Sequence, residues 1–148
     1  MALNKDSKII IGKSDVADLP TFNLENVKVK IDSGAYTSTI HCSVITETEN
    51  GLEVVFLDNS EGGFTGEKMI FKDYKQRKVR SSNGKLEVRF SVKGSILLFE
   101  KKYFTEFTLS KRNLMRYPIL LGRKLLSNHF LIDTTKTNLS YKQKIKKT

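Results

Sequence analysis

Hydrophobic and polar residues alternate with a period of two along much of this chain, a pattern typical of strands with one buried face. The alternation is clearest in residues 26–31 (NVKVKI), 52–58 (LEVVFLD) and 85–92 (KLEVRFSV). Residues 95–109 (SILLFEKKYFTEFTL) predict either one long strand or a second hairpin. Two shorter apolar runs, 117–122 (YPILLG) and 129–134 (HFLIDT), predict two more buried strands. The chain is therefore expected to consist mainly of short strands.

Turn and helix signals agree with this pattern. Asn83-Gly84 separates two strand-like runs, and Asn-Gly is the strongest two-residue hairpin signal because both positions of a type I′ turn need a positive φ. Residues 60–66 (SEGGFTG) form a glycine-rich loop. Only residues 123–128 (RKLLSN) have a helical pattern, and they provide little more than one turn. Regular short strands with one short helix after the strand that ends in Leu-Leu-Gly predict an all-β fold that closes into a barrel.

The length and composition are those of one ordinary globular domain. The chain has 148 residues, of which 39% are hydrophobic and 28% charged. No apolar run approaches the roughly 18 residues that a membrane-spanning helix needs, so no membrane partner is expected. The apolar run near the N-terminus is too short for a signal peptide, and the single cysteine allows no internal disulfide. These features predict a cytoplasmic protein with one domain over residues 1–135 and a flexible basic tail over 136–148.

The chain is strongly basic, with a net charge of +10 from 26 lysines and arginines and 16 acidic residues. Part of the excess lies in the tail, and a second concentration lies between residues 72 and 93. This second group consists of Lys72, Lys75, Arg77, Lys78, Arg80, Lys85, Arg89 and Lys93, opposed only by Asp73 and Glu87. A basic excess favours acidic partners, either nucleic acid or an anionic peptide, although the solvated face of a strand pair would have the same composition.

The strongest candidate for chemistry is Asp32, which directly follows the first alternating run in the sequence DSGAYTS. Gly34 permits a sharp turn, and Ala35 leaves room for another segment to pack. Ser33 and Thr37 provide hydroxyls that could hold a carboxylate or a neighbouring loop. The same tripeptide also occurs in ordinary Asx turns, in which Asp bonds to its own backbone. Asp32 therefore needs support from a second motif before it indicates an enzyme.

That second motif is ILLGRKLL, residues 119–126. Together with the strand that ends in DSGA, it resembles the two signatures of retropepsin-like aspartic proteases. In that family a hydrophobic-hydrophobic-Gly element packs beneath the loop that bears the catalytic Asp, and the resemblance assigns this place to Leu120, Leu121 and Gly122. It implies a closed retropepsin-like barrel.

Four segments in order, KVKIDSGAYTSTIH, VRSSNGKLEVRF, EFTLSKRNLMRYPILLGRKLL and FLIDTTKTNL, are similar to the bacterial family named ATP-dependent zinc proteases. Members of that family resemble retropepsins and often accompany ATP-grasp ligases that add glutamate to proteins, which implies a functional link to such a ligase. The chain departs from the family in two places. Tyr36 stands where an Arg is usual, and retroviral relatives carry a nearby acid that can pair with the Arg after the later Gly, so Arg123 here is without an expected partner. Ser33 replaces the usual Thr while keeping the hydroxyl.

The resemblance implies an aspartic-type endopeptidase, and such an enzyme needs two carboxylates that share one proton. This chain has one Asp-Ser-Gly, and its other aspartates lack the Ser/Thr-Gly that should follow. The prediction is therefore a homodimer in which Asp32 of each subunit meets on a two-fold axis and Ser33 ties the two loops together. The basic excess suggests acidic or glutamate-rich peptides as substrates.

The predicted hairpin around Asn83-Gly84 resembles the flap with which retropepsins cover their substrate. The resemblance assigns substrate contacts to the hairpin residues Arg80, Ser81, Ser82, Asn83 and Gly84. A plain surface hairpin is the alternative.

No metal or cofactor is predicted. The only histidines and cysteine are His41, Cys42 and His129, and neighbouring residues in a strand point to opposite faces. The sequence has no HExxH, no CxxC and no phosphate-binding GxxxxGK loop. Cys42 is expected to be a small core residue and His129 a polar residue at the start of a strand.

Two other functions remain open from the sequence. One is a peptide-binding module that keeps the protease barrel without efficient catalysis. The other is a basic β-barrel for single-stranded nucleic acid, which would stack bases on aromatic side chains. The aromatic residues available for that role are Phe56, Phe64, Phe71, Phe90, Tyr103 and Phe104.

Overall fold

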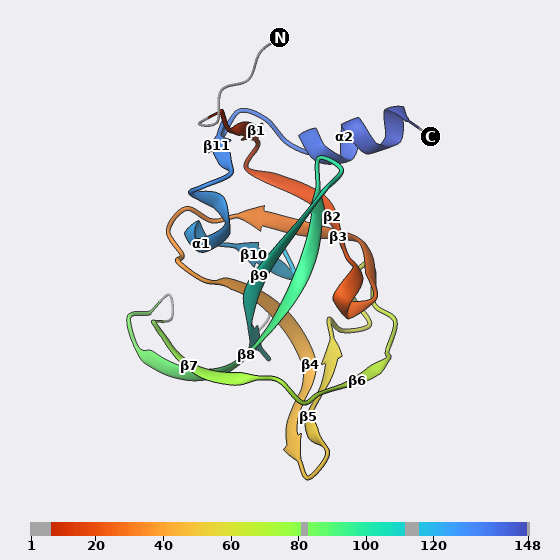
Figure 1. The fold of residues 1–148 in the computed structure, drawn as a ribbon, viewed down its shortest axis with the longest axis vertical. Helices are drawn as coiled ribbons and strands as arrows, with labels where there is room; N and C mark the ends of the chain where they lie inside the picture. Colours follow the sequence, from red (N-terminus) through yellow and green to blue (C-terminus); the bar gives the residue numbers. More distant parts are fainter. Residues whose placement is uncertain (1–6, 81–82, 112–115, 148) are drawn as a thin grey trace.

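In the computed structural model, residues 7–80, 83–111 and 116–147 are described, and most of them lie in strands (Figure 1). The strands are β1 (Ile9–Ile11), β2 (Ser14–Leu19), β3 (Leu24–Ile31), β4 (Ser38–Thr48), β5 (Gly51–Phe56), β6 (Lys68–Phe71), β7 (Lys75–Arg80), β8 (Leu86–Leu98), β9 (Lys101–Ser110), β10 (Ile119–Leu121) and β11 (Phe130–Ile132). The helices are the short 3-10 turn η1 (Pro20–Phe22), α1 (Arg123–Leu126) and α2 (Leu139–Lys146). None of these helices, the ones in the described ranges, is long and apolar enough to cross a membrane.

The main sheet closes on itself. The strand order β10–β3–β2–β8–β9–β4 returns to its start because β4 also pairs with β10. Strands β5 and β6 extend this sheet beyond β4, and β7 pairs with the outer part of β8. The prediction of an all-β closed barrel is confirmed, with α1 in the predicted place after β10.

Residues 95–109, which predicted either one strand or a hairpin, contain a hairpin. β8 ends at Leu98, β9 begins at Lys101, and these two residues face each other across the turn. Phe99 and Glu100 both have positive φ, 53° and 64°, as a two-residue type I′ turn requires. Phe and Glu rarely occupy the two positions of a type I′ turn. The pairing of β8 with β9, rather than the preference of these two residues, therefore determines this turn.

The barrel core is centred on Phe22, which is fully buried. Its ring centroid lies 4.6 Å from that of Phe56, 5.6 Å from Phe107 and 5.9 Å from Phe71. Gly94 of β8 makes this packing possible, because a Cβ at that position would lie 2.4 Å from the Phe22 ring. The aromatic cluster therefore depends on a glycine in the middle of a strand.

The segment predicted as a basic tail, residues 136–148, contains the helix α2. In α2 the backbone N–H groups of Ser140 and Tyr141 donate to the buried Asp15 carboxylate of β2, at 2.9 and 3.0 Å. The Ser140 hydroxyl also accepts a hydrogen bond from the Phe99 N–H at 2.8 Å. The sequence analysis missed this helix because its lysine-rich sequence has no apolar stripe. Its first turn is capped by a carboxylate from a distant strand.

Candidate active site

Loop 32–37 joins β3 to β4. It passes around the end of β10, the strand that lies between them. β10 runs parallel to β3, with Leu121 opposite Ile31, and antiparallel to β4, with Ile119 opposite Ile40. In Figure 1 the loop curves around α1 at the left of the barrel. This arrangement brings Asp32 and the Leu-Leu-Gly element together, as predicted.

Asp32 begins a tight turn. Its backbone N–H donates to the Leu121 carbonyl at 2.9 Å, and its Oδ1 accepts a hydrogen bond from the Gly34 N–H at 3.0 Å. The Asp32 side chain is half-buried, whereas Ser33 and Gly34 are exposed. The Asx-turn interpretation and the candidate-site interpretation are therefore compatible, since the turn presents the carboxylate at the surface.

Gly122 lies directly beneath this loop. Its N–H donates to the Ser38 hydroxyl at 3.1 Å. A Cβ on Gly122 would lie 2.6 Å from the Tyr36 carbonyl oxygen and 2.8 Å from the Thr37 carbonyl carbon, so only glycine allows the loop to approach this closely. Thr37 was expected to provide a supporting hydroxyl. Ser38 provides one instead, and the only local signal for it was the hydroxyl-rich stretch YTST.

The first turn of α1 completes the support. The N–H groups of Arg123 and Lys124 donate to the carbonyls of Ala35 and Tyr36, at 2.8 and 2.9 Å. The Arg123 guanidinium donates to the Ser33 carbonyl at 2.9 Å and lies 5.9 Å from the centre of the Tyr36 ring. The expectation that Arg123 lacks a partner is therefore wrong. A backbone carbonyl and an aromatic face take the place of an acidic side chain.

Strands β7 and β8 form the predicted hairpin, with Arg80 opposite Leu86. Gly84 has a φ of +83° and accepts a hydrogen bond from the Arg80 guanidinium at 2.8 Å. Asn83 accepts one from the Lys85 N–H, while Ser81 and Ser82 lie outside the described residues. The end of this hairpin projects on the same side of the barrel as loop 32–37 (Figure 1).

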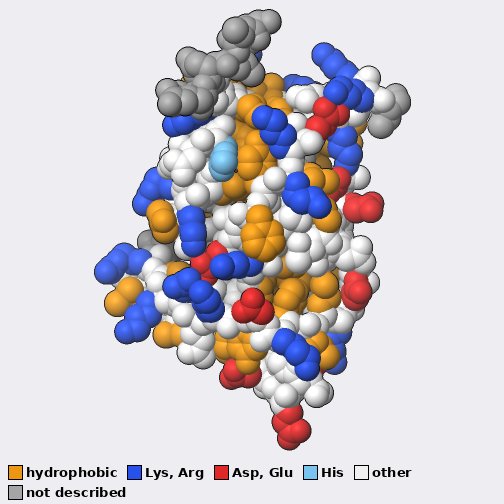
Figure 2. Space-filling model, in the orientation of Figure 1, with side chains coloured by type: hydrophobic (Ala, Val, Ile, Leu, Met, Phe, Trp, Pro, Cys, Tyr) orange, Lys and Arg blue, Asp and Glu red, His pale blue; other side chains and the backbone are white. Residues whose placement is uncertain are grey.

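The basic residues of this region are not equivalent. Arg77 binds Glu106, and Arg89 binds Glu87, so their charges are already paired. The exposed remainder consists of Lys72, Lys75, Lys78, Arg80, Lys85 and Lys93. Figure 2 shows Lys and Arg side chains gathered over the part of the surface formed by β7 and β8. A positive surface thus lies on the β7–β8 hairpin.

One group in the described part of the chain could hold a metal ion, namely His41, Asp58 and Glu61, whose ligand atoms lie within 4.8 Å of one another. His41 is buried, and its Nδ1 is 2.7 Å from Glu61 Oε1, a direct hydrogen bond. Asp58 Oδ1 accepts hydrogen bonds from the Ser60 N–H and hydroxyl. The backbone N–H of His41 donates to the Pro118 carbonyl, just before β10, whereas Asp32 binds Leu121 at the other end of β10. This group therefore lies away from Asp32. Cys42 is a core residue, and burial raises the pKa of its thiol.

The aromatic residues considered for stacking bases are mostly part of the core. Phe56 is buried, and Phe71, Phe90 and Tyr103 are partly buried and packed against the core. Phe64 and Phe104 are the exposed members of the set, at 36% and 69%. Phe64 lies in the loop between β5 and β6, and Phe104 lies on β9. They do not form the continuous stacking platform that single-stranded nucleic acid uses.

Comparisons with known proteins agree with this geometry. Residues 10–143 match the family described as RimB-like, retropepsin-like aspartic endopeptidase RimB. A Legionella pneumophila protein of unknown function, Lpg0085, has a similar structure, with a TM-score of 0.70 and 26% identity over 90% of this chain and 99% of that one.

The chain is also similar to several proteins named probable alpha-L-glutamate ligase. The protein from Shewanella halifaxensis is 32% identical over 142 residues, which is 89% of this chain and 30% of the relative. The protein from Parasynechococcus marenigrum is 31% identical over 132 residues, 85% of this chain and 28% of the relative. This chain thus spans less than a third of the ligases that it matches.

The family match covers nearly the whole chain, and the fold places the two signature motifs in contact. The predicted resemblance to retropepsins is confirmed, while the narrower name of ATP-dependent zinc protease is not the one that these comparisons give. The chain belongs to the RimB-like family of retropepsin-like aspartic endopeptidases.

Proposed function

We propose that this protein is an aspartic endopeptidase that acts as a homodimer, with Asp32 of each subunit forming half of the catalytic pair. The observation that carries the proposal is the placement of Asp32 on a surface turn fixed from beneath by β10 and α1. Such support holds a reacting carboxylate in one position, which catalysis requires.

The chemistry follows from two like charges held close together. Two neighbouring carboxylates share one proton, so one is ionised and the other is protonated. The ionised group would accept a proton from the attacking water as its oxygen bonds to the peptide carbonyl carbon. The protonated group would donate to the carbonyl oxygen. Collapse of the tetrahedral intermediate then breaks the C–N bond, and the amine leaves with a proton from the pair. This scheme uses neither zinc nor ATP.

A second copy of the chain is part of the proposal because several other aspartates have different partners. Asp15 accepts hydrogen bonds from α2, Asp18 binds Lys144, and Asp133 accepts two hydrogen bonds from Thr135. The exposed Ser33 would connect the two Asp32 loops across the two-fold axis.

We further propose acidic or glutamate-rich peptides as substrates. The exposed lysines and arginine on and beside β7–β8 would attract such peptides. Relatives named as probable glutamate ligases contain a segment similar to this chain, which supports a functional link to a ligase that adds glutamate. Such a link would place the protein in the cytoplasm.

The test is hydrolysis of one glutamate-rich and one neutral peptide, from mildly acidic to neutral pH, by the wild type and by Asp32→Asn. We expect a loss of at least about 1,000-fold with Asp32→Asn, because the pair can no longer share a proton. Asp133→Asn is the matched control and should cleave like the wild type. Cleavage that survives Asp32→Asn would refute the mechanism. An active species that sediments only as a monomer would also refute it.

A further inference from the structure

Glu106 is a buried carboxylate that the proposed chemistry does not use. It belongs to β9, and its side chain is 3% exposed. Arg77 Nε donates to its Oε2 at 2.7 Å, and Lys124 Nζ donates to its Oε1 at 2.9 Å. The Ser91 hydroxyl donates to the same Oε2 as Arg77. Both carboxylate oxygens are thus bound by cationic groups.

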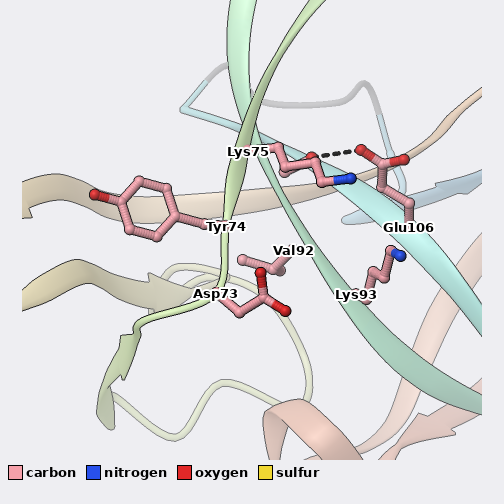
Figure 3. A pocket seen from close by; sticks show the side chains of 7 residues that line it. Asp73, Tyr74, Lys75, Val92, Lys93 and Glu106 are labelled. Atoms are coloured by element: carbon pink, nitrogen blue, oxygen red, sulfur yellow. Dashed lines mark hydrogen bonds between the residues drawn. The ribbon is translucent and has the colours of Figure 1, made fainter.

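The donors come from three separate elements. Arg77 lies on β7, Ser91 on β8, and Lys124 on α1. Figure 3 shows Glu106 reaching from β9 towards the ribbon that carries Lys75, at a cavity of about 210 Å³ at the base of the hairpin. Glu106 therefore sits where the hairpin, the barrel wall and the helix beneath the active-site loop meet.

Glu106 keeps its negative charge at mildly acidic and at neutral pH. Burial by itself would raise the pKa of this carboxyl, but the hydrogen bonds from Arg77, Ser91 and Lys124 outweigh it and lower the pKa to about 2. The carboxylate is therefore ionised at mildly acidic and neutral pH, where an aspartic peptidase would be assayed. Breaking a buried pair from one side leaves an uncompensated charge, so each of these contacts holds its element firmly.

The β7 strand has few other attachments. It pairs only with β8 among the described residues, and β8 runs past the end of its pairing with β9 over residues 86–90. The cavity beside Glu106 leaves the base of β7 incompletely packed. The Arg77–Glu106 pair is a side-chain contact between β7 and the barrel strand β9, and just before β7 the Tyr74 hydroxyl donates to Glu47 of β4.

A continuous series of contacts then leads to the active-site turn. Glu106 binds the Lys124 side chain, and the Lys124 N–H donates to the Tyr36 carbonyl of loop 32–37. The neighbouring Arg123 binds the Ser33 carbonyl next to Asp32. We propose that Glu106 is a positioning residue that fixes the β7–β8 hairpin relative to the Asp32 loop by binding Arg77 on one side and Lys124 on the other. This inference rests on the proposed function, because a fixed hairpin matters only if it covers a bound peptide.

The experiment compares Arg77→Met with Lys78→Met. Both remove one positive charge from β7, but Arg77 pairs with Arg89 on the face that binds Glu106, whereas Lys78 pairs with Val88 on the opposite face. Backbone amide exchange, followed by mass spectrometry, reports on the hairpin without any need for activity. In Arg77→Met we expect exchange within residues 75–80 and 86–91 to quicken on the order of 100-fold, with the core strands β2, β3 and β10 unchanged.

Cleavage of a neutral peptide provides the second readout. Arg77→Met should raise KM more than it lowers kcat, by about tenfold in kcat/KM, because a displaced hairpin weakens peptide binding before it alters the carboxylate pair. Lys78→Met should leave hairpin exchange at the wild-type rate and measures the effect of charge alone on cleavage.

The outcomes separate the two proposals. Unchanged hairpin exchange in Arg77→Met, or exchange that quickens throughout the barrel, would overturn the positioning role of Glu106. Another outcome is exchange in Arg77→Met that quickens in the hairpin alone while the wild type cleaves neither peptide. That result would support the positioning role of Glu106 and refute the proposed peptidase activity. Faster hairpin exchange together with raised KM supports both.

Discussion

Asp32 and Asp133 occupy the same kind of turn but have different surroundings. In each, Oδ1 accepts a hydrogen bond from the N–H two residues later, at 3.0 Å from Gly34 and at 2.9 Å from Thr135. Thr135 also donates its hydroxyl to Asp133 Oδ1 at 2.6 Å, whereas Gly34 has no side chain to do so. The turn at Asp58 repeats the arrangement of Asp133, with Ser60 as the donor.

This difference separates two structural carboxylates from the candidate catalytic one. The hydroxyl and N–H of Thr135 lower the pKa of Asp133, and those of Ser60 lower the pKa of Asp58. Both carboxylates are thereby committed to the ionised form. A glycine two residues after Asp32 leaves its carboxylate without a hydroxyl partner of this kind, which suits a group that must share and exchange a proton.

The second difference is support from the rest of the fold. Loop 32–37 receives hydrogen bonds from Arg123 and Lys124, and the Gly122 N–H donates to Ser38 at the start of β4. The Asp133 turn is instead held by the segment around β1, because the Asp133 N–H donates to the Ile11 carbonyl and the Lys13 N–H donates to the Lys136 carbonyl. The Asx turn is therefore a recurrent local structure in the described part of this chain, and contact with β10 and α1 distinguishes the candidate site.

The largest effect should come from removing that support with Gly122→Ala. The added methyl would lie 2.6 Å from the Tyr36 carbonyl oxygen, so the loop must shift. We expect the free energy of unfolding to fall by about 1–3 kcal/mol and cleavage to be lost, because Asp32 is displaced. Chemical denaturation and peptide hydrolysis measure the two effects.

Gly62→Ala is the control for this change, since a Cβ there has no neighbour within 4 Å. It should alter stability by less than about 0.5 kcal/mol. Equal stability of Gly122→Ala and Gly62→Ala would contradict the close packing of the loop on Gly122.

A smaller effect should come from making the Asp32 turn resemble the Asp58 turn, with Gly34→Ser. A hydroxyl at this position can donate to the ionised carboxylate, as Ser60 does to Asp58. Because the ionised form gains stability, protons leave the pair at lower pH. Both limbs of the pH–rate profile should move towards acid by about one unit, and activity at neutral pH should fall about tenfold.

Gly34→Ala adds the same Cβ without the hydroxyl, and this Cβ would lie 3.3 Å from Asp32 Oδ1. It should lower activity without moving the pH profile. If the two variants have the same profile, the hydroxyl does not account for the difference between the turns.

The smallest effect should come from Asp133→Asn, which changes the turn that lacks the support of β10 and α1. An amide oxygen can still accept the hydrogen bonds of Thr135, so the turn is expected to keep its shape. Cleavage rate and pH profile should match those of the wild type. A shift in the pH profile would mean that Asp133, rather than Asp32 alone, titrates in the reaction.

Local features of the sequence were sufficient for several of the strands and for half of the site, but they did not predict β1, β2, β4 or β6. Alternation predicted β3, β5 and β8, and the apolar runs predicted β10 and β11. The Asp32 turn and the helix after Gly122 could also be predicted, because their signals lie within a few neighbouring residues. The family resemblance then paired these two motifs correctly.

The tertiary structure alone decided which distant residues complete these features. Ser38 binds Gly122 across 84 positions of the sequence, Ser33 binds Arg123 across 90, and Asp15 caps α2 across 125. The role of Glu106 likewise depends on elements that meet only in the folded chain. Side-chain periodicity reports on which face of a strand is buried, and it contains no information about which remote donor or acceptor that face will meet.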